Sequence, residues 1–245
     1  MRRTLLFLLV GLAFIPSVAL SQDTSTPAAD QSGPETIAAV VNAETITEDT
    51  LSAVAALNQI FEVVFTQLPQ SFGQALLSTP EGTTFLDRYQ RDVLDQLIDS
   101  RLLVQQAKEL PIAVDESNVT EQVEGRLDQI MQQNQLTLDQ IADILEQQGS
   151  SLDEYRENLA STVREQLMVQ GLQEEIVRDA TVTDEQIKSH YDEHTSEYTD
   201  ADGTITPLED VRDKIFDTLL QQAQSDLWNA WFTKVKDEAD IQILF

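Results

Sequence analysis

Helix-start signals recur along this sequence more often than any other structural pattern. Three expected helix starts before Thr206 match the capping box, in which a Ser or Thr side chain and a Glu or Gln three residues later bond to free backbone N–H groups. They are Thr137 with Gln140, Ser151 with Glu154, and Thr183 with Gln186. Apolar residues follow each start at the spacing of one helix face. The pattern predicts a mainly α fold.

The predicted helices cover most of the chain. Thr47 is expected to cap a first helix that runs to Leu68, where Pro69 ends it. An irregular connection is expected over 69–83 because it holds two prolines and two glycines, and a second helix is expected over 85–110. Further helices are predicted to begin at Asp115, at the three capping boxes and after Thr206.

The two ends of the chain are predicted to meet. Residues 206–209 combine a cap, a proline at the first helical position and the matching Glu, and they start a helix of about thirty residues. The chain then closes on 241–245, where apolar residues alternate as in a strand. We expect this strand to pair with Val40–Val41, which leads through a turn into a second short β segment at Thr45–Ile46.

The first residues carry an export signal. Two arginines precede an apolar run, and a proline and small residues follow it. This is the order of a secretory signal peptide, and the run is too short to cross a bilayer as a retained anchor. We therefore expect a signal peptide over 1–21, a disordered linker over 22–36 and a single helical domain over 37–245.

The charge balance narrows the classes of function. The chain has 15 Lys and Arg against 43 Asp and Glu, a formal net charge of −28, and no cysteine. Such an acidic surface disfavours nucleic acid or anionic lipid as partners, because phosphate binding needs clustered cations. The lack of cysteine excludes disulfides and thiolate chemistry, and no Walker-type glycine loop is present. We expect no enzyme and no cofactor, and we attribute the acidity to solubility rather than to basic clients or divalent cations.

Both histidines lie in the sequence His190-Tyr191-Asp192-Glu193-His194, which matches the inverted zinc-protease pattern. Residues four apart share a helix face, so the two imidazoles could hold a zinc ion. A catalytic zinc needs a third protein ligand, and no further histidine or cysteine exists to supply one. We therefore predict no metal site, and a zinc hydrolase is the least favoured alternative.

A group of apolar residues around the expected 69–83 connection is the candidate binding site. Phe61 and Leu68 lie on the apolar stripe of the first helix and are expected in the core. The residues that lie off the stripe or in the connection are Phe65, Phe72, Leu76 and Leu77. We predict that they line an exposed apolar groove, which usually marks an interaction site in a soluble protein, with burial in the core as the alternative.

Three stretches carry a resemblance to a known family. A strand-turn-helix opening is found in AAVVNAETITEDTL, a helix–turn–helix in VLDQLIDSRLLVQQAKELPIAVDESNV, and an exit from a long helix in TVTDEQIKSHYDEHTSEY. In this order, over about Ile37–Tyr198, they resemble the SurA-like periplasmic chaperones, which share a fold theme with trigger factor and PrsA. The resemblance implies a helical chaperone domain with a long returning C-terminal helix and a small β pairing between the N-terminal segment and the C-terminal strand.

The sequence departs from that family in two places. Members commonly insert a parvulin-type prolyl isomerase domain after the last of these segments, whereas TDADGTIT alone separates Tyr198 from Pro207 here. No histidine remains for a parvulin-like site, so isomerase activity is not carried over. Ala43 stands where glycine is usual, which is tolerable if the turn avoids positive φ.

The resemblance implies an ATP-independent holding chaperone that binds extended apolar segments of exported or outer-membrane proteins. It would act in the periplasm, with the outside of the cell as the alternative location. A second hypothesis is a structural or adaptor protein of the cell envelope that keeps the scaffold and binds one dedicated partner or itself. The range of proteins bound distinguishes the two hypotheses, because a chaperone delays the aggregation of unrelated substrates and an adaptor does not.

Overall fold

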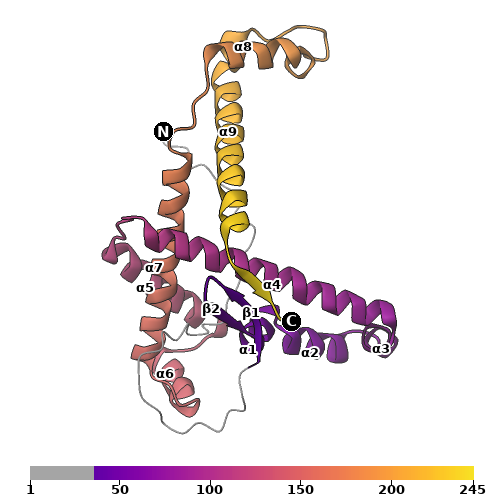
Figure 1. The fold of residues 1–245 in the computed structure, drawn as a ribbon, viewed down its shortest axis with the longest axis vertical. Helices are drawn as coiled ribbons and strands as arrows, with labels where there is room; N and C mark the ends of the chain where they lie inside the picture. Colours follow the sequence, from indigo (N-terminus) through magenta and orange to yellow (C-terminus); the bar gives the residue numbers. More distant parts are fainter. Residues whose placement is uncertain (1–35) are drawn as a thin grey trace. The chain divides into compact units, whose positions relative to one another are not determined.

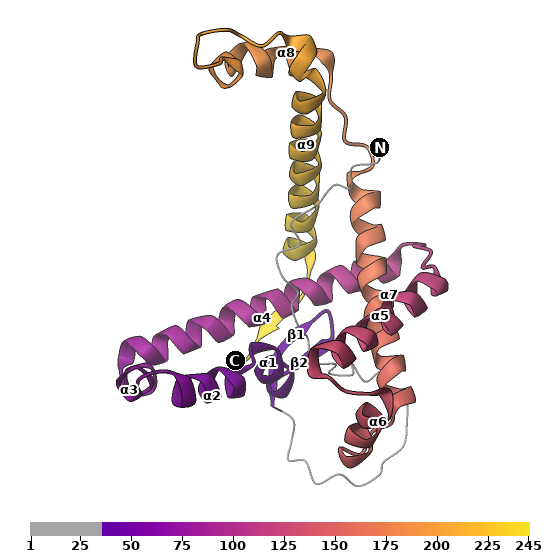
Figure 2. The ribbon, with the colours of Figure 1, turned by 180° about the vertical axis from the view of Figure 1, so that it is seen from behind.

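The computed structural model describes residues 36–245, which fold into helices and one small sheet (Figure 1, and from behind in Figure 2). The predicted signal peptide and nearly all of the predicted linker fall on residues 1–35, outside the described residues. The mainly α prediction is confirmed. In the part of the chain that the structure describes, no helix combines the length and the apolar character needed to span a lipid bilayer.

The described chain divides into two compact units, each built from segments that are far apart in the sequence. Unit 1 takes the described residues up to Leu103, together with Asp115–Arg164 and Asp240–Phe245. Unit 2 takes Val104–Val114 and Glu165–Ala239. The expectation of a single domain stays a prediction.

A three-stranded antiparallel sheet joins the two ends of unit 1. Strands β1 (Ile37–Val41), β2 (Glu44–Thr47) and β3 (Ile241–Ile243) lie in the order β2-β1-β3. The register places Val40 opposite Gln242, which confirms the predicted pairing of the C-terminal strand with this segment. β1 is the central strand, and three of its five side chains are buried.

Asn42 and Ala43 form the tight turn between β1 and β2. Their φ angles are 48° and 70°. The turn therefore does not avoid positive φ, which was the condition for tolerating alanine at position 43. A two-residue hairpin turn needs positive φ because only this hand follows the twist of the strands. Asn42 also holds the start of β3: its N–H donates to the carbonyl of Asp240, and its Oδ1 accepts from the N–H of Asp240, both at 2.9 Å.

The first predicted helix is two helices in the structure, α1 (Glu48–Ala55) and α2 (Leu57–Gln67). Ala56 breaks the run in the left-handed conformation, at φ 50°. The hydroxyl of Tyr89 donates to the carbonyl of Ala55 at 2.9 Å and so satisfies one of the carbonyl groups left free at the end of α1. The expectation of one continuous helix is wrong because the apolar spacing continues across a single left-handed residue.

The stretch predicted to be irregular contains a helix, α3 (Gln70–Ser78). The next helix, α4 (Pro80–Glu109), follows almost at once and begins earlier than the predicted residue 85. Both prolines stand at helix starts, where a missing N–H breaks no hydrogen bond, so they do not argue against helices here. The most deeply buried residues of α4 are Leu94, Ile98, Leu102 and Ala107.

The helix starts predicted from capping chemistry are confirmed in the middle of the chain. Asp115 precedes α5 (Glu116–Asn134), Thr137 precedes α6 (Leu138–Gln147) and Ser151 precedes α7 (Leu152–Val177). The capping box is complete at Thr137. At Ser151 it is half formed, because the carboxylate of Glu154 accepts from the hydroxyl of Ser150 instead. Gly149 separates α6 from α7 at φ 80°, as its predicted role as a terminator requires.

Unit 2 is organised by two helices that pack against each other, α8 (Asp184–Glu193) and α9 (Leu208–Glu238). Each buries one isoleucine, Ile187 in α8 and Ile215 in α9. The predicted capping box of Thr183 is complete at the start of α8. The long C-terminal helix is confirmed, with 31 residues.

The connection between α8 and α9 is a 3-10 helix followed by the tight loop 199–206, whose ends form a β-bridge. The N–H of Thr206 donates to the carbonyl of Tyr198 at 2.8 Å and closes the loop. The predicted cap at Thr206 is wrong: Pro207 is the capping residue, without a side-chain bond. The carbonyl of Thr206 instead accepts from the hydroxyl of Tyr191 at 2.7 Å.

Deleting Ile241–Phe245 should destabilise unit 1. The deletion removes the pairing of β3 with β1, including the 2.9 Å bond from the N–H of Leu244 to the carbonyl of Ala38. Each lost backbone bond contributes about 1 kcal/mol, so we expect the free energy of unfolding to fall by about 2–4 kcal/mol in urea denaturation. Gln242→Ala, which keeps the backbone pairing, is the control. An unchanged midpoint in the shortened chain would contradict the pairing.

Ala43→Gly should stabilise the protein. Glycine adopts φ 70° without the steric penalty that a Cβ brings, and the gain exceeds the extra entropy of the unfolded chain. We expect the free energy of unfolding to rise by about 0.5–1 kcal/mol, measured by the same denaturation. Ala53→Gly, in the interior of α1, is the matched control and should lower it by about 1 kcal/mol. A loss of stability in Ala43→Gly would refute the left-handed assignment.

Candidate functional site

Exposed apolar side chains are concentrated on one part of unit 1. Six of the eleven large apolar side chains that are exposed in the described residues come from residues 63–85. We name them the apolar surface: Val63, Phe65, Leu68, Phe72, Leu77 and Phe85. Leu68 lies just after the end of α2, and the others lie on α2, on α3 and on the first turns of α4, which follow one another along the chain (Figure 1). Apolar clustering of this kind marks interaction sites.

Most of the predicted groove residues are exposed. Phe65 is 64% exposed and Phe72 51%, and Leu77 is also exposed, whereas Leu76 is half-buried. Leu68 was expected in the core and is 40% exposed, because α2 ends at the preceding residue and Leu68 adopts an extended backbone. Phe61 is half-buried.

Val63 and Phe85 belong to the apolar surface and were not predicted. Val63 is 44% exposed beside the buried Val64, so one helical step separates the two environments. Phe85 is 61% exposed and lies one turn before the half-buried Tyr89. For Val63 a signal was available in the helical spacing, since it falls outside the apolar stripe of its own helix. For Phe85 the spacing gives no such signal, because residues four apart share a helix face and Phe85 therefore lies on the side of Tyr89.

α3 approaches α2 closely within the apolar surface. Gly73 is buried, and a Cβ at this position would lie 3.2 Å from Cγ1 of Val64 and 3.6 Å from Cε1 of Phe65. The absence of a side chain therefore lets α3 pack directly on α2. The ring of Phe65 lies beside the backbone of Gly73 and remains exposed on its other side.

The corner between α3 and α4 depends on a second glycine. A Cβ on Gly82 would collide with the carbonyl of Leu76 and would lie 2.6 Å from the carbonyl oxygen of Ala75. Thr79 closes the same corner, because its hydroxyl donates to the carbonyl of Ala75 at 2.6 Å and accepts from the N–H of Gly82 at 3.2 Å. The corner places Leu77 and Phe85 at fixed positions on either side of it.

The apolar surface is nearly free of charge. From Thr50 to Leu86 the sequence contains two charged residues, Glu62 and Glu81, although 24% of the whole chain is charged. Without Lys or Arg, this stretch offers no partner for a phosphate or a carboxylate. What it can do chemically is remove apolar surface of a ligand from water.

The paired histidines lie in α8 and just after it. Their rings are stacked with centroids 4.3 Å apart. Nδ1 of His194 lies 2.9 Å from the carbonyl of His190, and Nδ1 of His190 lies 3.3 Å from the hydroxyl of Tyr198. Among residues 36–245, no three metal-binding side chains of the His, Cys, Asp or Glu type gather in one place.

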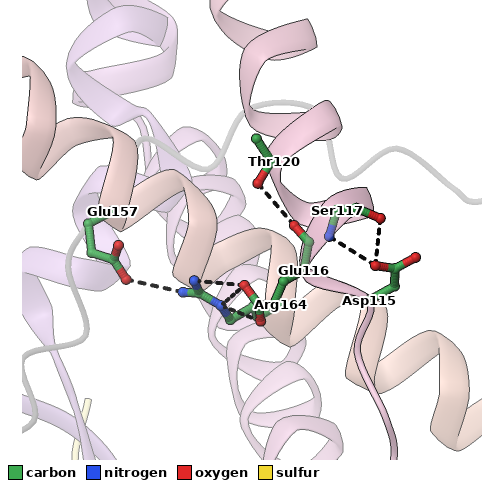
Figure 3. Close-up of polar contacts among 6 residues, drawn as sticks. All are labelled: Asp115, Glu116, Ser117, Thr120, Glu157 and Arg164. Atoms are coloured by element: carbon green, nitrogen blue, oxygen red, sulfur yellow. Dashed lines mark hydrogen bonds and ion pairs between the residues drawn. The ribbon is translucent and has the colours of Figure 1, made fainter.

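The strongest charged cluster ties α5 to α7 within unit 1 (Figure 3). The guanidinium of Arg164 bonds to both carboxylate oxygens of Glu116 at 3.0–3.1 Å and to Glu157 at 3.1 Å. These bonds, first those to Glu116, raise the pKa of Arg164. The hydroxyl and N–H of Ser117 donate to Asp115 and lower the pKa of its carboxyl. The cluster is exposed and saturated with its own partners, so it serves to hold the start of α5.

Unit 2 contains a cavity of about 300 Å³. Its lining residues are Leu110, Pro111, Ile112, Ala113, Gly171 and Glu175. A Cβ on Gly171 would lie 2.5 Å from Cγ2 of Ile112, so this glycine lets the loop after α4 pack on α7. Glu175 is the one ionisable side chain of the lining. Its carboxylate pairs with the guanidinium of Arg178. The lining therefore offers no second ionisable group to complete an acid–base or nucleophile pair.

Curated proteins named foldase protein PrsA are similar to this chain. That of Caldanaerobacter subterraneus subsp. tengcongensis is 29% identical over 200 residues, covering 80% of this chain and 53% of that protein. That of Clostridium kluyveri is 27% identical over 172 residues, covering 68% of this chain and 49% of that protein. The chain thus spans about half the length of these curated relatives.

A solved structure and a family model also match. The structure comes from a study that describes PEB4 and the periplasmic protein Cj1289 as two structurally related SurA-like chaperones of Campylobacter jejuni. It has a TM-score of 0.46 and 13% identity, covering 86% of this chain and 100% of that chain. The family model described as the SurA-like N-terminal domain matches residues 2–173. Since this match takes in well over half of the sequence, the chain belongs to the SurA-like N-terminal domain family.

Proposed function

We propose that this protein is an ATP-independent holding chaperone that captures extended apolar segments of unfolded exported proteins. The observation that carries the proposal is the apolar surface, on which Phe65, Phe72 and Phe85 are each at least half exposed. Leaving such side chains in water forgoes about 1.5–3 kcal/mol for each one that could be fully buried. A partner that covers them recovers part of this free energy.

The chemistry of the apolar surface suits many clients. It offers aromatic and aliphatic side chains, and its stretch of sequence has no cation that would select an anionic ligand. Any segment that has not yet buried its apolar side chains can bind to such a surface, and it is released once folding buries them. Each contact is weak, so capture is reversible and no covalent or nucleotide-driven step is needed.

Family membership and the names of the relatives support this role. We place the protein in the periplasm or just outside the cell, because the first residues predict a signal peptide. Outer-membrane proteins in transit are the proposed client class. Their strands alternate apolar and polar residues and remain extended and unburied until the barrel closes.

We also propose that this chain acts without prolyl isomerase activity. In the described residues, the loop 199–206 runs directly from α8 and the 3-10 helix into α9 and is closed by the bond from Thr206 to Tyr198. This is the place where members of the resembled family carry an isomerase domain. Both histidines of the sequence lie just before it and are engaged with neighbouring groups, His190 with Tyr198 and His194 with His190.

Replacing three exposed residues together, Phe65→Ser, Phe72→Ser and Leu77→Ser, should abolish most of the holding activity. Light scattering would follow the aggregation of an unfolded outer-membrane protein and of an unrelated unfolded soluble protein. We expect wild type to suppress both at near-stoichiometric amounts, and the triple variant to need about tenfold more protein. Ile144→Ser is the matched control, because Ile144 is 41% exposed on α6, outside the apolar surface.

Circular dichroism would first establish that all variants are folded. If wild type suppresses the aggregation of neither client, the holding function is wrong and a dedicated adaptor of the cell envelope takes its place. If the control loses as much activity as the triple variant, the apolar surface is not the binding site.

A further inference from the structure

Strand β3 forms an edge of the sheet in unit 1. β1 lies on one side of it, and no strand within residues 36–245 lies on the other. In an antiparallel pair, alternate residues bond to the partner strand, and the residues between them direct their N–H and C=O groups away from it. The positions that bond to β1 therefore decide which backbone groups face outward.

The hydrogen bonds fix this alternation. At one end of β3 the carbonyl of Asp240 accepts from the N–H of Asn42, and at the other the N–H of Leu244 donates to the carbonyl of Ala38. Residues 240, 242 and 244 thus face β1. The residues between them, Ile241 and Ile243, direct their backbone N–H and C=O groups to the outer edge.

β3 is short, with three residues, but it lacks the other features that usually protect edge strands. Proteins block such edges with charged side chains, prolines or bulges. Residues 241–245 read Ile-Gln-Ile-Leu-Phe and contain neither a charge nor a proline, and the pairing of β3 with β1 runs without a bulge. Ile243 is 48% exposed and Leu244 61%, so apolar side chains flank the outward backbone groups.

We propose that the outer edge of β3 takes up an extended segment of a client as a fourth strand, bonded to the backbone of Ile241 and Ile243. The proposal rests on the holding function above and adds a second mode of capture to it. Main-chain hydrogen bonds do not depend on the sequence of the client, so they combine promiscuity with a defined extended geometry. The apolar surface and β3 belong to the same unit, so one client chain can engage both.

The net negative charge of the chain determines which kind of segment can pair with β3. A second copy of this chain would bring another net charge of −28 to the edge, and like charges oppose such pairing. A segment of low or positive charge is attracted by the same field. The occupant is therefore an extended client segment of alternating apolar and polar residues with low or positive charge, such as an unpaired strand of a membrane barrel protein.

A pair of peptides tests this proposal on the unmodified protein. The probe is a short peptide of alternating Val and Thr with a terminal Lys, and its partner carries N-methyl groups on alternate residues of the bonding edge. We expect fluorescence anisotropy to show at least about tenfold weaker binding of the methylated peptide. We also expect the bound unmethylated peptide to slow hydrogen exchange at the N–H groups of Ile241 and Ile243.

A backbone variant gives a second test. Ile243→Pro removes one outward N–H but no bond to β1, so the fold should persist while peptide affinity falls about tenfold. Gln242→Ala, whose backbone faces β1, should bind the peptide like wild type. Equal affinity for both peptides, or full affinity in Ile243→Pro, would overturn the proposal.

Two further results would distinguish binding of a client strand at the edge of β3 from dimerisation and from capture by the apolar surface alone. Sedimentation that shows a dimer of wild type, dissociated by Ile243→Pro, would assign the edge to a second copy and overturn the proposal. Full suppression of client aggregation by Ile243→Pro, without slowed exchange at Ile241 in wild type, would overturn the edge proposal alone and leave the holding function in place.

Discussion

Strand β1 is the constraint on which the rest of unit 1 depends. It pairs with β2 on one side and with β3 on the other, so residues from both ends of the described chain share one sheet. Its Ala38 and Ala39 are fully buried. The guanidinium of Arg101 in α4 then bonds to Glu44 of β2 at 2.8 Å, and the hydroxyl of Tyr89 holds the end of α1. These two bonds connect α4 to the sheet and to α1, and α4 carries part of the apolar surface.

The apolar surface is held by backbone contacts rather than by a large core of its own. Among the side chains of α2 whose burial the structure describes, Val64 is the buried one, and α3 buries its glycine, Gly73. Helices that meet through a glycine can lie close together while their larger side chains point outward. This arrangement leaves Phe65 and Phe72 in water, which disfavours the isolated chain and favours association with unfolded segments. The surrounding sequence supports the same use, since its two charged residues are both acidic.

The parts of the fold that could be predicted from the sequence are those set by neighbours a few residues apart. The cap of Thr47 on Thr50 and the capping boxes at Thr137 and Thr183 involve partners three residues away, so the sequence alone reveals them. The break at Ala56 and the positive φ of Ala43 could not be predicted in the same way. Alanine carries no local signal for a left-handed backbone. At the exposed Ala43 the two-residue hairpin turn requires this conformation.

The exposure of the candidate residues was predictable in part, and their role in binding stays a prediction. Phe65, Phe72 and Leu77 are exposed as expected. Phe65 falls outside the apolar spacing of the first predicted helix, and the other two lie in the segment that was expected to be irregular. The spacing also placed Leu68 in the core, and this failed because α2 ends just before it. The helix α3 was missed because two prolines and two glycines indicate an irregular connection, whereas both prolines stand at helix starts and Gly73 packs against α2.

Photocrosslinking tests the central claim, capture of clients at the apolar surface, most directly. A photoreactive amino acid would replace Phe72 in one variant and Ile144 in another, since both side chains are exposed in unit 1. Each variant would be irradiated with two unrelated unfolded proteins. Our account predicts crosslinks to both clients from position 72 and few from position 144. Equal yields from the two positions, or none from position 72, would contradict it.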